Sequence, residues 1–499
     1  MRKVFAPSPF LRDLFVTAGT SLVTAGSLIL VTRALAQGLG PDGFGLYALS
    51  RRMLAVITPC LSLGMGAAVA RYIATERGEN KQLQILTSGV MLVVLTSITL
   101  LSGGLVVFRV VPLSSFVQTD VQSILPVTVF MAIGYAFYLL LYGFYRGVGR
   151  MYTANLWQLA IVAFGPVVIV QLFAGVASIS QILALMGGLY LLALIPLGSL
   201  LWHGQHLSLR PQSALASMKT LLRYGVPRVP GTSALAAIFA SGPFLAPYVL
   251  SLKAVGELSI GQLFLTMTEA CLAALGVVLL PKAAQLFADH KTAFLRQRIG
   301  DLLVFVLHTG TFVSLQLMLW ADTLIHIWLG ADYYDAILLS RIMFLGFVPY
   351  FLYVTFRSII DAIEERAINT CNIYVALAVT IVTSLTGVIV GFGSVGLALG
   401  LTLGMSSLGI TTIGYLYKAG WVHVSRYHFF EFCTLNFGAV GVGWSIRKFY
   451  GMDMVPIVML GCIGMLETLL FAAYFMVLRW LNVAWTIEVE NRILKRQAQ

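Results

Sequence analysis

Residues 82–108 read QLQILTSGVMLVVLTSITLLSGGLVVF, a stretch of 27 residues without a charged side chain. About 20 apolar residues suffice for a helix to cross the hydrocarbon core of a membrane, so this stretch predicts a transmembrane helix. The whole chain has the same character: of 499 residues 59% are hydrophobic and 10% are charged, and the mean hydropathy is +0.90. Soluble proteins carry about 25% charged residues. The composition therefore predicts an all-α polytopic membrane protein without a soluble catalytic domain.

Fourteen apolar runs, separated by short charged or Gly/Pro-bearing segments, predict about fourteen transmembrane helices. They cover residues 13–32, 44–73, 82–108, 121–143, 153–174, 180–202, 222–249, 257–281, 299–320, 336–360, 367–390, 395–417, 429–446 and 455–478. If the N-terminus is inside, the inner segments hold 23 of the 32 Lys and Arg residues and the outer segments hold six. The positive-inside rule then predicts that both termini are cytoplasmic.

Several features argue against other classes of protein. The five cysteines are widely spaced and form no C-x-x-C motif, so neither a disulfide nor a metal site is expected. The formal net charge of +12 is scattered over short loops, which fits membrane topology better than nucleic-acid binding. Residues 391–396 (GFGSVG) match a dinucleotide-binding pattern, but that site requires a preceding β-strand. We expect a tight turn between two helices there, and no cofactor.

A faint internal repeat has an offset of 211 residues. It aligns Leu11–Arg12 with Leu222–Arg223, Gly45 with Gly256, Cys60–Leu61 with Cys271–Leu272 and Arg71 with Lys282. Because six helices per repeat give both halves the same orientation, the pattern predicts a pseudo-two-fold axis along the membrane normal and an alternating-access transporter. The predicted parts are a six-helix N-terminal lobe at residues 1–210, a six-helix C-terminal lobe at 211–420, and two additional helices with a cytoplasmic tail at 421–499.

Two neighbouring stretches carry a family resemblance. Residues 39–49 (LGPDGFGLYAL) and 63–74 (LGMGAAVARYIA) resemble the first helical hairpin of the bacterial polysaccharide transporters, the O-antigen flippase group. Further matches are LLRYGVP at residues 221–227, VLLPK at 278–282 and YRGVGR at 145–150. The similarity extends over the first twelve predicted helices. That family belongs to the multidrug/oligosaccharidyl-lipid/polysaccharide exporter superfamily.

The resemblance implies a function and a set of partners. Members of such a family would form two lobes around a central cavity in the bacterial inner membrane. They would flip an isoprenoid-diphosphate-linked oligosaccharide to the outer leaflet for O-antigen or exopolysaccharide synthesis. The implied partners are this lipid-linked substrate, membrane lipids, and the polysaccharide polymerase and assembly proteins. The resemblance implies a transporter and not an enzyme.

Two adjacent arginines, Arg51 and Arg52, lie about two turns from the outer end of the second predicted helix. Their sector of the helix continues through small and polar residues, which typically line cavities or pack against other helices. Because arginine makes bidentate hydrogen bonds with phosphate, at least one of them is a candidate substrate-binding residue. The alternative is snorkelling to the outer headgroups, or an ion pair with an outer acid such as Glu257.

Arg228 lies near the inner start of the seventh predicted helix, which contains four prolines. Pro227, Pro230, Pro243 and Pro247 predict a bent or broken helix. At that depth Arg228 is a third candidate substrate-binding residue, positioned to receive the diphosphate from the inner leaflet. Snorkelling at the inner interface is the alternative.

Acidic residues inside predicted helices are candidates for ion coupling. Glu269 lies near the middle of the eighth predicted helix, on a stripe with Gln262 and Thr266. It is either a coupling-ion or proton site or a member of a structural ion pair. Glu467, on the last predicted helix, is a weaker candidate. His308 is expected to be a satisfied polar residue and not a proton relay.

Two further groups have predicted structural roles. Arg357 is expected to meet Asp361 or Glu364 in a solvated cluster, next to Glu365, at the inner end of the tenth predicted helix. The aromatic residues of the fourth and tenth predicted helices are expected to form interfacial belts and packing contacts in preference to stacking on sugars. They are Tyr135, Phe137, Tyr138, Tyr142, Tyr145, Tyr350, Phe351 and Tyr353.

Two rival functions remain open. A cation-coupled multidrug antiporter should carry acids in the first lobe, where only Asp13 is available. A membrane-embedded polymerase or ligase needs a sizeable catalytic loop. The longest predicted outer loop, residues 321–335, contains Asp322, His326, Asp332 and Asp335. The anion carrier is favoured, with substrate passing from Arg228 to Arg51 and Arg52.

Overall fold

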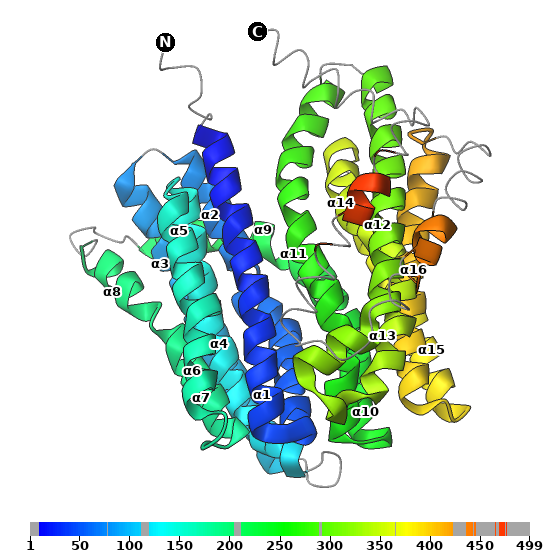
Figure 1. The fold of residues 1–499 in the computed structure, drawn as a ribbon. Helices are drawn as coiled ribbons and strands as arrows, with labels where there is room; N and C mark the ends of the chain where they lie inside the picture. The colour runs from blue at the N-terminus through cyan, green and yellow to red at the C-terminus, as the bar shows by residue number, and fades with distance from the viewer. Residues whose placement is uncertain are drawn as a thin grey trace, which may run out of the picture. The chain divides into compact units, whose positions relative to one another are not determined.

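The computed structural model describes residues 9–76, 78–110, 119–203, 211–288, 292–364, 366–422, 436–442, 444–445, 465, 469–474 and 476 (Figure 1). The described residues are helices joined by short turns and contain no β-strand. The chain divides into two compact units, residues 1–259 and 260–499.

The first unit is an antiparallel bundle of helices. Its elements are α1 (Pro9–Ser62), α2 (Met65–Thr75), α3 (Glu79–Val110), α4 (Thr119–Gly147), α5 (Met151–Gln158), the π-helical turn η2 (Leu159–Phe164), α6 (Gly165–Phe173), α7 (Ile179–Leu191), α8 (Leu194–His203), α9 (Pro211–Gly225), the 3₁₀ turn η4 (Val226–Arg228) and α10 (Val229–Val249). The start of α11 (Leu252–Ala288) completes it.

The helix α1 contains a sharp break at Gly40. This residue has φ 71° and ψ −176°, a conformation that glycine adopts without the steric cost of a Cβ atom. Pro41 follows it and cannot donate a backbone hydrogen bond to the preceding turn. Two helices therefore meet at Gly40, as the sequence predicts. The helix predicted at 44–73 is not continuous, because it is broken at Leu63 and Gly64, which have φ 47° and 68°. Figure 1 shows α1 turning back at this end of the unit.

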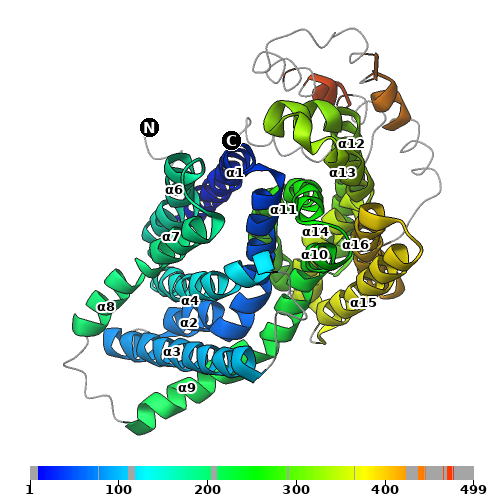
Figure 2. The ribbon, with the colours of Figure 1, turned by 90° about the horizontal axis from the view of Figure 1, so that it is seen from below.

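The helix α4 lies at the centre of the first unit and packs against α1, α2 and α7 (Figure 2). Glycines permit the closest of these contacts. A Cβ atom on Gly143 of α4 would lie 2.3 Å from the carbonyl oxygen of Gly66 on α2. Small residues allow helix backbones in membrane proteins to approach closely, so this contact holds the two helices in a fixed register.

The second unit is built from the remainder of α11, α12 (Thr292–Leu329), the 3₁₀ turn η5 (Ala331–Tyr333), α13 (Asp335–Leu345), α14 (Phe347–Ile363), α15 (Ile368–Ile389) and α16 (Gly393–Lys418). The helices α15 and α16 form a close hairpin. Its turn lies at residues 390–392, where Gly391 has φ 91°, and the rest of the glycine-rich segment 391–396 begins α16. The predicted helix hairpin turn is thus confirmed.

The predicted membrane character is confirmed. Among the described residues, nine helices are long and apolar enough to cross a membrane, and ten if the bent pair α13 and α14 forms one span. Their bounds match most of the predicted runs within a few residues. Most of the two helices predicted at residues 429–446 and 455–478 lies outside the described residues. The predicted lobe boundary at residue 210 concerns the repeat and stays a prediction, since the compact units divide at Ser259.

Two predictions for the second half were wrong. The tenth predicted helix is broken at Gly346, where α13 and α14 meet at 48°. In addition, the predicted outer loop 321–335 is mostly helical, because α12 continues to Leu329. Arg341 lies 3.7 Å from the Asp322 carboxylate and donates to the carbonyl oxygen of Met318. The ion pair with Arg341 offsets the charge of Asp322, so α12 continues past this residue.

The close contact between α2 and α4 leads to a stability prediction. Gly143→Ala should lower the melting temperature of the purified protein by several degrees, because the new methyl group would collide with the Gly66 carbonyl. Gly188→Ala on α7 is the matched control, since no atom lies within 4 Å of its added Cβ. It should leave stability unchanged or raise it, because alanine favours a helix over glycine by about 1 kcal/mol. Equal melting temperatures for the two variants would contradict the packing described.

Candidate functional site

Arg51 lies in the second half of α1, within the α1–α4–α7 packing of the first unit. Its guanidinium donates a hydrogen bond to the Tyr190 hydroxyl and interacts electrostatically with the phenol groups of Tyr47 and Tyr135. The side chains of Tyr47 and Tyr190 are 3% and 1% exposed. No carboxylate pairs with Arg51 within the part of the chain that the structure describes. Because phenols are neutral, the positive charge of Arg51 is solvated by polar groups but not cancelled.

The tyrosines around Arg51 continue into an aromatic column along α4. Tyr135 contacts Tyr190 edge to face at 5.1 Å and lies 5.4 Å from Tyr138, which stacks on Tyr142 at 6.0 Å. The guanidinium of Arg146 then lies 5.4 Å from the Tyr142 ring centre. The column thus extends from Arg51 to Arg146. At a helical rise of 1.5 Å per residue, its segment from Tyr135 to Arg146 is about 16 Å long.

Arg52 points to a different neighbour. Its guanidinium lies 5.6 Å from the ring centre of Phe239 on α10, a cation–π distance. The two arginines diverge because adjacent helical residues point about 100° apart. The structure therefore places Arg51 among the tyrosines and Arg52 at the α1–α10 contact. The outer acid that the sequence suggested as a partner, Glu257, forms an ion pair with Lys253 at 3.4 Å.

Arg228 lies apart from the Arg51 cluster. It ends the 3₁₀ turn η4, where the prolines interrupt the helix between α9 and α10 as predicted. Its side chain is exposed, donates to the carbonyl oxygen of Tyr224 at 2.7 Å and lies 3.6 Å from the Tyr224 ring centre. The three candidate arginines therefore do not form one site in this structure.

In the second unit, Glu269 on α11 is bound by two residues of α14. The Tyr350 hydroxyl donates to its carboxylate at 2.6 Å, and the guanidinium of Arg357 lies 3.6 Å away. The side chains of Glu269 and Arg357 are 28% and 30% exposed. Glu269 thus takes part in an ion pair, one of the two roles predicted for it. A coupling role stays a prediction.

The pairing of Arg357 corrects the predicted cluster at the inner end of the tenth helix. Arg357 is paired with Glu269 and not with Asp361 or Glu364. Asn369 of α15 links this region, because its amide donates to the Arg357 carbonyl at 2.8 Å and to Asp361 at 2.7 Å. Glu364 accepts a hydrogen bond from the Tyr415 hydroxyl of α16. Glu365 lies outside the described residues.

The two units share a tyrosine–arginine pair at corresponding positions. Tyr142 and Arg146 on α4 correspond, at the repeat offset of 211 residues, to Tyr353 and Arg357 on α14. The cation–π distances are 5.4 Å in the first pair and 5.7 Å in the second. Sequence reasoning recorded this offset at other positions but missed this pair. It was detectable as the same Tyr-x-x-x-Arg spacing in both halves.

The remaining predictions have mixed outcomes. Phe137, Tyr138, Tyr350, Phe351 and Tyr353 are buried, so they pack inside the units and do not form interfacial belts. His308 is satisfied as expected, by the Tyr474 hydroxyl at 2.6 Å. Glu467 lies outside the described residues, as does the side chain of Asp13. Among the described residues, no cluster of His, Cys, Asp and Glu could hold a metal ion.

A double-mutant cycle tests the ion pair of the second unit. Glu269→Gln and Arg357→Gln should each lower the melting temperature of the purified protein, because each leaves a partly buried charge without its partner. The double variant should lose less than the sum of the two single losses. Strictly additive losses would show that the two side chains do not interact.

Comparisons with known proteins show which family the chain belongs to. The family model described as polysaccharide biosynthesis protein matches residues 10–287. A search of curated proteins finds no match. Among solved structures, a lipid II flippase MurJ in an inward closed conformation matches at 13% identity and TM-score 0.67, covering 94% of this chain and 99% of that one.

A second similar structure is a multidrug resistance MATE transporter in an inward-facing conformation, with 15% identity and TM-score 0.64. The match covers 81% of this chain and 97% of that one. At these identities the two structures establish the fold. The family model extends over more than half of the 499 residues, and on that ground the chain belongs to the polysaccharide biosynthesis protein family.

Proposed function

We propose that the protein is a flippase that carries an isoprenoid-diphosphate-linked oligosaccharide from the inner to the outer leaflet of the bacterial inner membrane. The observation that carries the proposal is the state of Arg51, whose positive charge has three tyrosine neighbours and no described carboxylate. A charged side chain at the centre of a spanning helix costs about 2.5–3.5 kcal/mol. An anionic headgroup that bound beside Arg51 and these tyrosines would supply the missing negative charge.

Substrate recognition in this proposal combines charge and stacking. Phosphate oxygens accept bidentate hydrogen bonds from a guanidinium, which fits Arg51. Tyrosine combines a flat apolar face with a hydroxyl donor, and the α4 column presents several such rings in succession. The partly exposed rings of Tyr135 and Tyr142 are the ones that can contact the sugars next to the diphosphate. Phosphate and saccharide occur together in the lipid-linked precursors that a polysaccharide biosynthesis protein would handle.

Transport would proceed by alternating access, with two sources of energy. An interior-negative potential favours the outward movement of an anion by about 2.3 kcal/mol per charge per 100 mV. An ion gradient would be the second source. The Glu269–Arg357 pair would respond to it, because protonation of Glu269 would remove its attraction for Arg357. In this scheme the first unit binds the anion and the second responds to the ion gradient.

A cation-coupled multidrug antiporter is the second candidate, favoured by the structural similarity to a MATE transporter. A site for organic cations needs carboxylates near its aromatic groups. Among the described residues, Arg51 is instead a cation whose neighbours are neutral phenol groups. This arrangement repels a cationic drug, so the anion carrier is preferred.

Reconstituted liposomes distinguish the two functions. Wild-type protein should carry a fluorescent isoprenoid-diphosphate oligosaccharide from the protein's cytoplasmic side to the opposite leaflet, where a membrane-impermeant quencher detects it. Liposomes loaded with a cationic dye provide the second assay. Transport of the dye without movement of the lipid would replace the flippase with the antiporter.

Arg51→Gln should reduce the rate of lipid movement about 10- to 100-fold, because a hydrogen bond to a charged group contributes about 1.5–3 kcal/mol. Arg33→Gln is the matched control: it removes the same charge from an exposed position on the same helix and should retain the wild-type rate. Full activity of Arg51→Gln in correctly inserted protein would remove Arg51 from the substrate path.

A further inference from the structure

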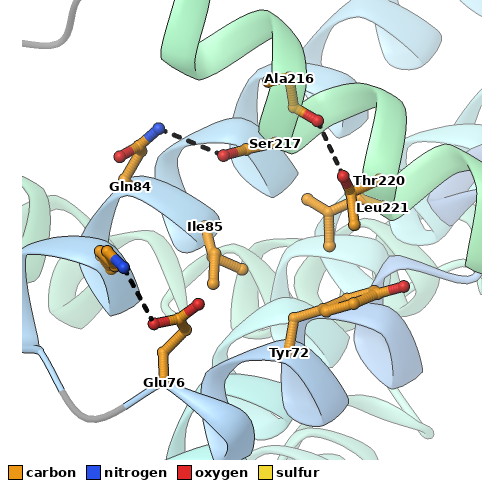
Figure 3. A pocket seen from close by; sticks show the side chains of 9 residues that line it. Tyr72, Glu76, Gln84, Ile85, Ala216, Ser217, Thr220 and Leu221 are labelled. Atoms are coloured by element: carbon orange, nitrogen blue, oxygen red, sulfur yellow. Dashed lines mark hydrogen bonds and ion pairs between the residues drawn. The ribbon is translucent and has the colours of Figure 1, made fainter.

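A pocket lies between α2, the start of α3 and α9, away from Arg51 (Figure 3). It consists of two adjoining cavities of about 350 and 390 Å³, which share Tyr72 of α2 and Thr220 of α9. The amide of Gln84 on α3 donates to the hydroxyl of Ser217 on α9 at 3.2 Å and ties one wall to the other. The pocket is therefore walled by three helices of the first unit.

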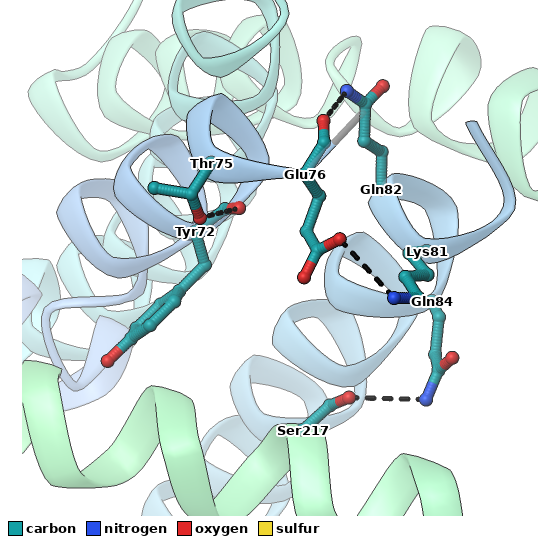
Figure 4. A network of polar contacts seen from close by, with 7 residues as sticks. All are labelled: Tyr72, Thr75, Glu76, Lys81, Gln82, Gln84 and Ser217. Carbon is teal, nitrogen blue, oxygen red and sulfur yellow. Dashed lines mark hydrogen bonds and ion pairs between the residues drawn. The ribbon is translucent and has the colours of Figure 1, made fainter. Parts of the chain in front are cut away.

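The larger cavity is basic. Lys219 and Arg223 of α9 line it together with Tyr72, Thr220 and Tyr224. Both cationic side chains are exposed, and neither has an acidic partner among the described residues. The acid of the adjoining cavity, Glu76, is paired with Lys81 at 3.6 Å (Figure 4). The charge of Lys219 and Arg223 is therefore available to a ligand.

Two more arginines reinforce this charge at Tyr224. The guanidinium groups of Arg71 and Arg228 lie 4.5 and 3.6 Å from the centre of its ring, and Tyr72 packs edge to face against it at 5.8 Å. A hydrogen bond to Tyr224 raises the pKa of Arg71. Like any arginine, Arg71 is positively charged at physiological pH. Four cations thus surround one pair of tyrosines.

The backbone fixes the position of this cluster. Gly64, between α1 and α2, has φ 68°, and a Cβ atom there would lie 2.9 Å from the Gly225 carbonyl oxygen. Gly225 ends α9, so two helix breaks touch each other directly. This contact holds Tyr72 and Tyr224 beside one another, one at each side of the junction.

The helix α9 has the character of an interfacial helix. Basic side chains occupy one part of its surface, Leu221 is buried, and Leu215 is 72% exposed. Amphipathic helices with basic polar faces lie at the level of the lipid headgroups. The ligand available at that level in high concentration is the phosphate group of a lipid.

We propose that this pocket binds the phosphate group of an anionic lipid. Lys219 and Arg223 would pair with the phosphate oxygens, and the hydroxyl of Tyr72 lies where it can donate a further hydrogen bond. The lipid is either a membrane phospholipid or an isoprenoid diphosphate. In the second case alone the inference rests on the proposed function, and the pocket is the place where substrate docks before it enters the protein.

Equilibrium binding to the full-length protein in a nonionic detergent tests the inference. The two probes are dihexanoyl phosphatidylglycerol and farnesyl diphosphate. Lys219→Gln/Arg223→Gln should weaken probe binding at least about tenfold, since two charge-assisted hydrogen bonds are lost. Arg150→Gln/Lys418→Gln is the matched control, because it removes two exposed cations elsewhere. It should change binding less than twofold.

Tyr72→Phe provides a second variant that retains the ring and its packing against Tyr224. It should weaken binding by a smaller factor than the loss of both cations. All variants are compared by size-exclusion profile and melting temperature, so that a folding defect is recognised.

The two probes identify the source of the phosphate. Tighter binding of farnesyl diphosphate assigns the pocket to the isoprenoid substrate, and equal or tighter binding of phosphatidylglycerol assigns it to membrane phospholipid. The proposal is overturned if wild type binds neither probe, or if the control variant loses as much affinity as the pocket variant. Transport by wild type is measured separately, so failure of the pocket leaves the flippase proposal intact.

Discussion

One electrostatic constraint governs the first unit: a guanidinium inside a membrane-embedded helix bundle must be solvated by the protein. Arg51 meets this constraint with phenol groups from its own helix and from α4 and α7. Neutral hydroxyls can accept its hydrogen bonds but leave its net charge in place. A carboxylate would have cancelled that charge. The choice of tyrosine therefore keeps a cation available in an aromatic environment, which is the chemistry that an anionic, sugar-bearing headgroup requires.

The second unit uses corresponding positions differently. Its arginine at the repeat position, Arg357, contacts Tyr353 as Arg146 contacts Tyr142, but it also forms an ion pair with Glu269. A duplicated tyrosine–arginine pair thus has an acid partner in the second unit. The proposed division of labour rests on the contrast between Arg357 and Arg51, since a paired arginine can respond to protonation of its acid while an arginine without a described carboxylate can hold an anion. Both roles rest on a few side chains placed by rigid helices.

The sequence predicted the helices because continuous apolar runs bounded by charges and prolines determine them. It also identified Arg51 and Glu269, since charges inside apolar runs are costly and visible. It missed their partners, because Tyr190 is 139 residues from Arg51 and Arg357 is 88 residues from Glu269. Such contacts depend on how the helices pack. The break at Gly346 and the helical continuation through Asp322 were missed for the same reason: each depends on contacts with other helices.

The most direct test of the central claim is photo-crosslinking in bacterial membranes. A benzophenone amino acid at position 142, a partly exposed site in the α4 column, should label a radioactive isoprenoid-diphosphate oligosaccharide, and Arg51→Gln should abolish that labelling. The same probe at position 152, where Tyr152 is 72% exposed, should give only background. Labelling at position 142 that persists without Arg51, or that only equals the background at position 152, would contradict the claim that Arg51 holds the substrate's anionic group.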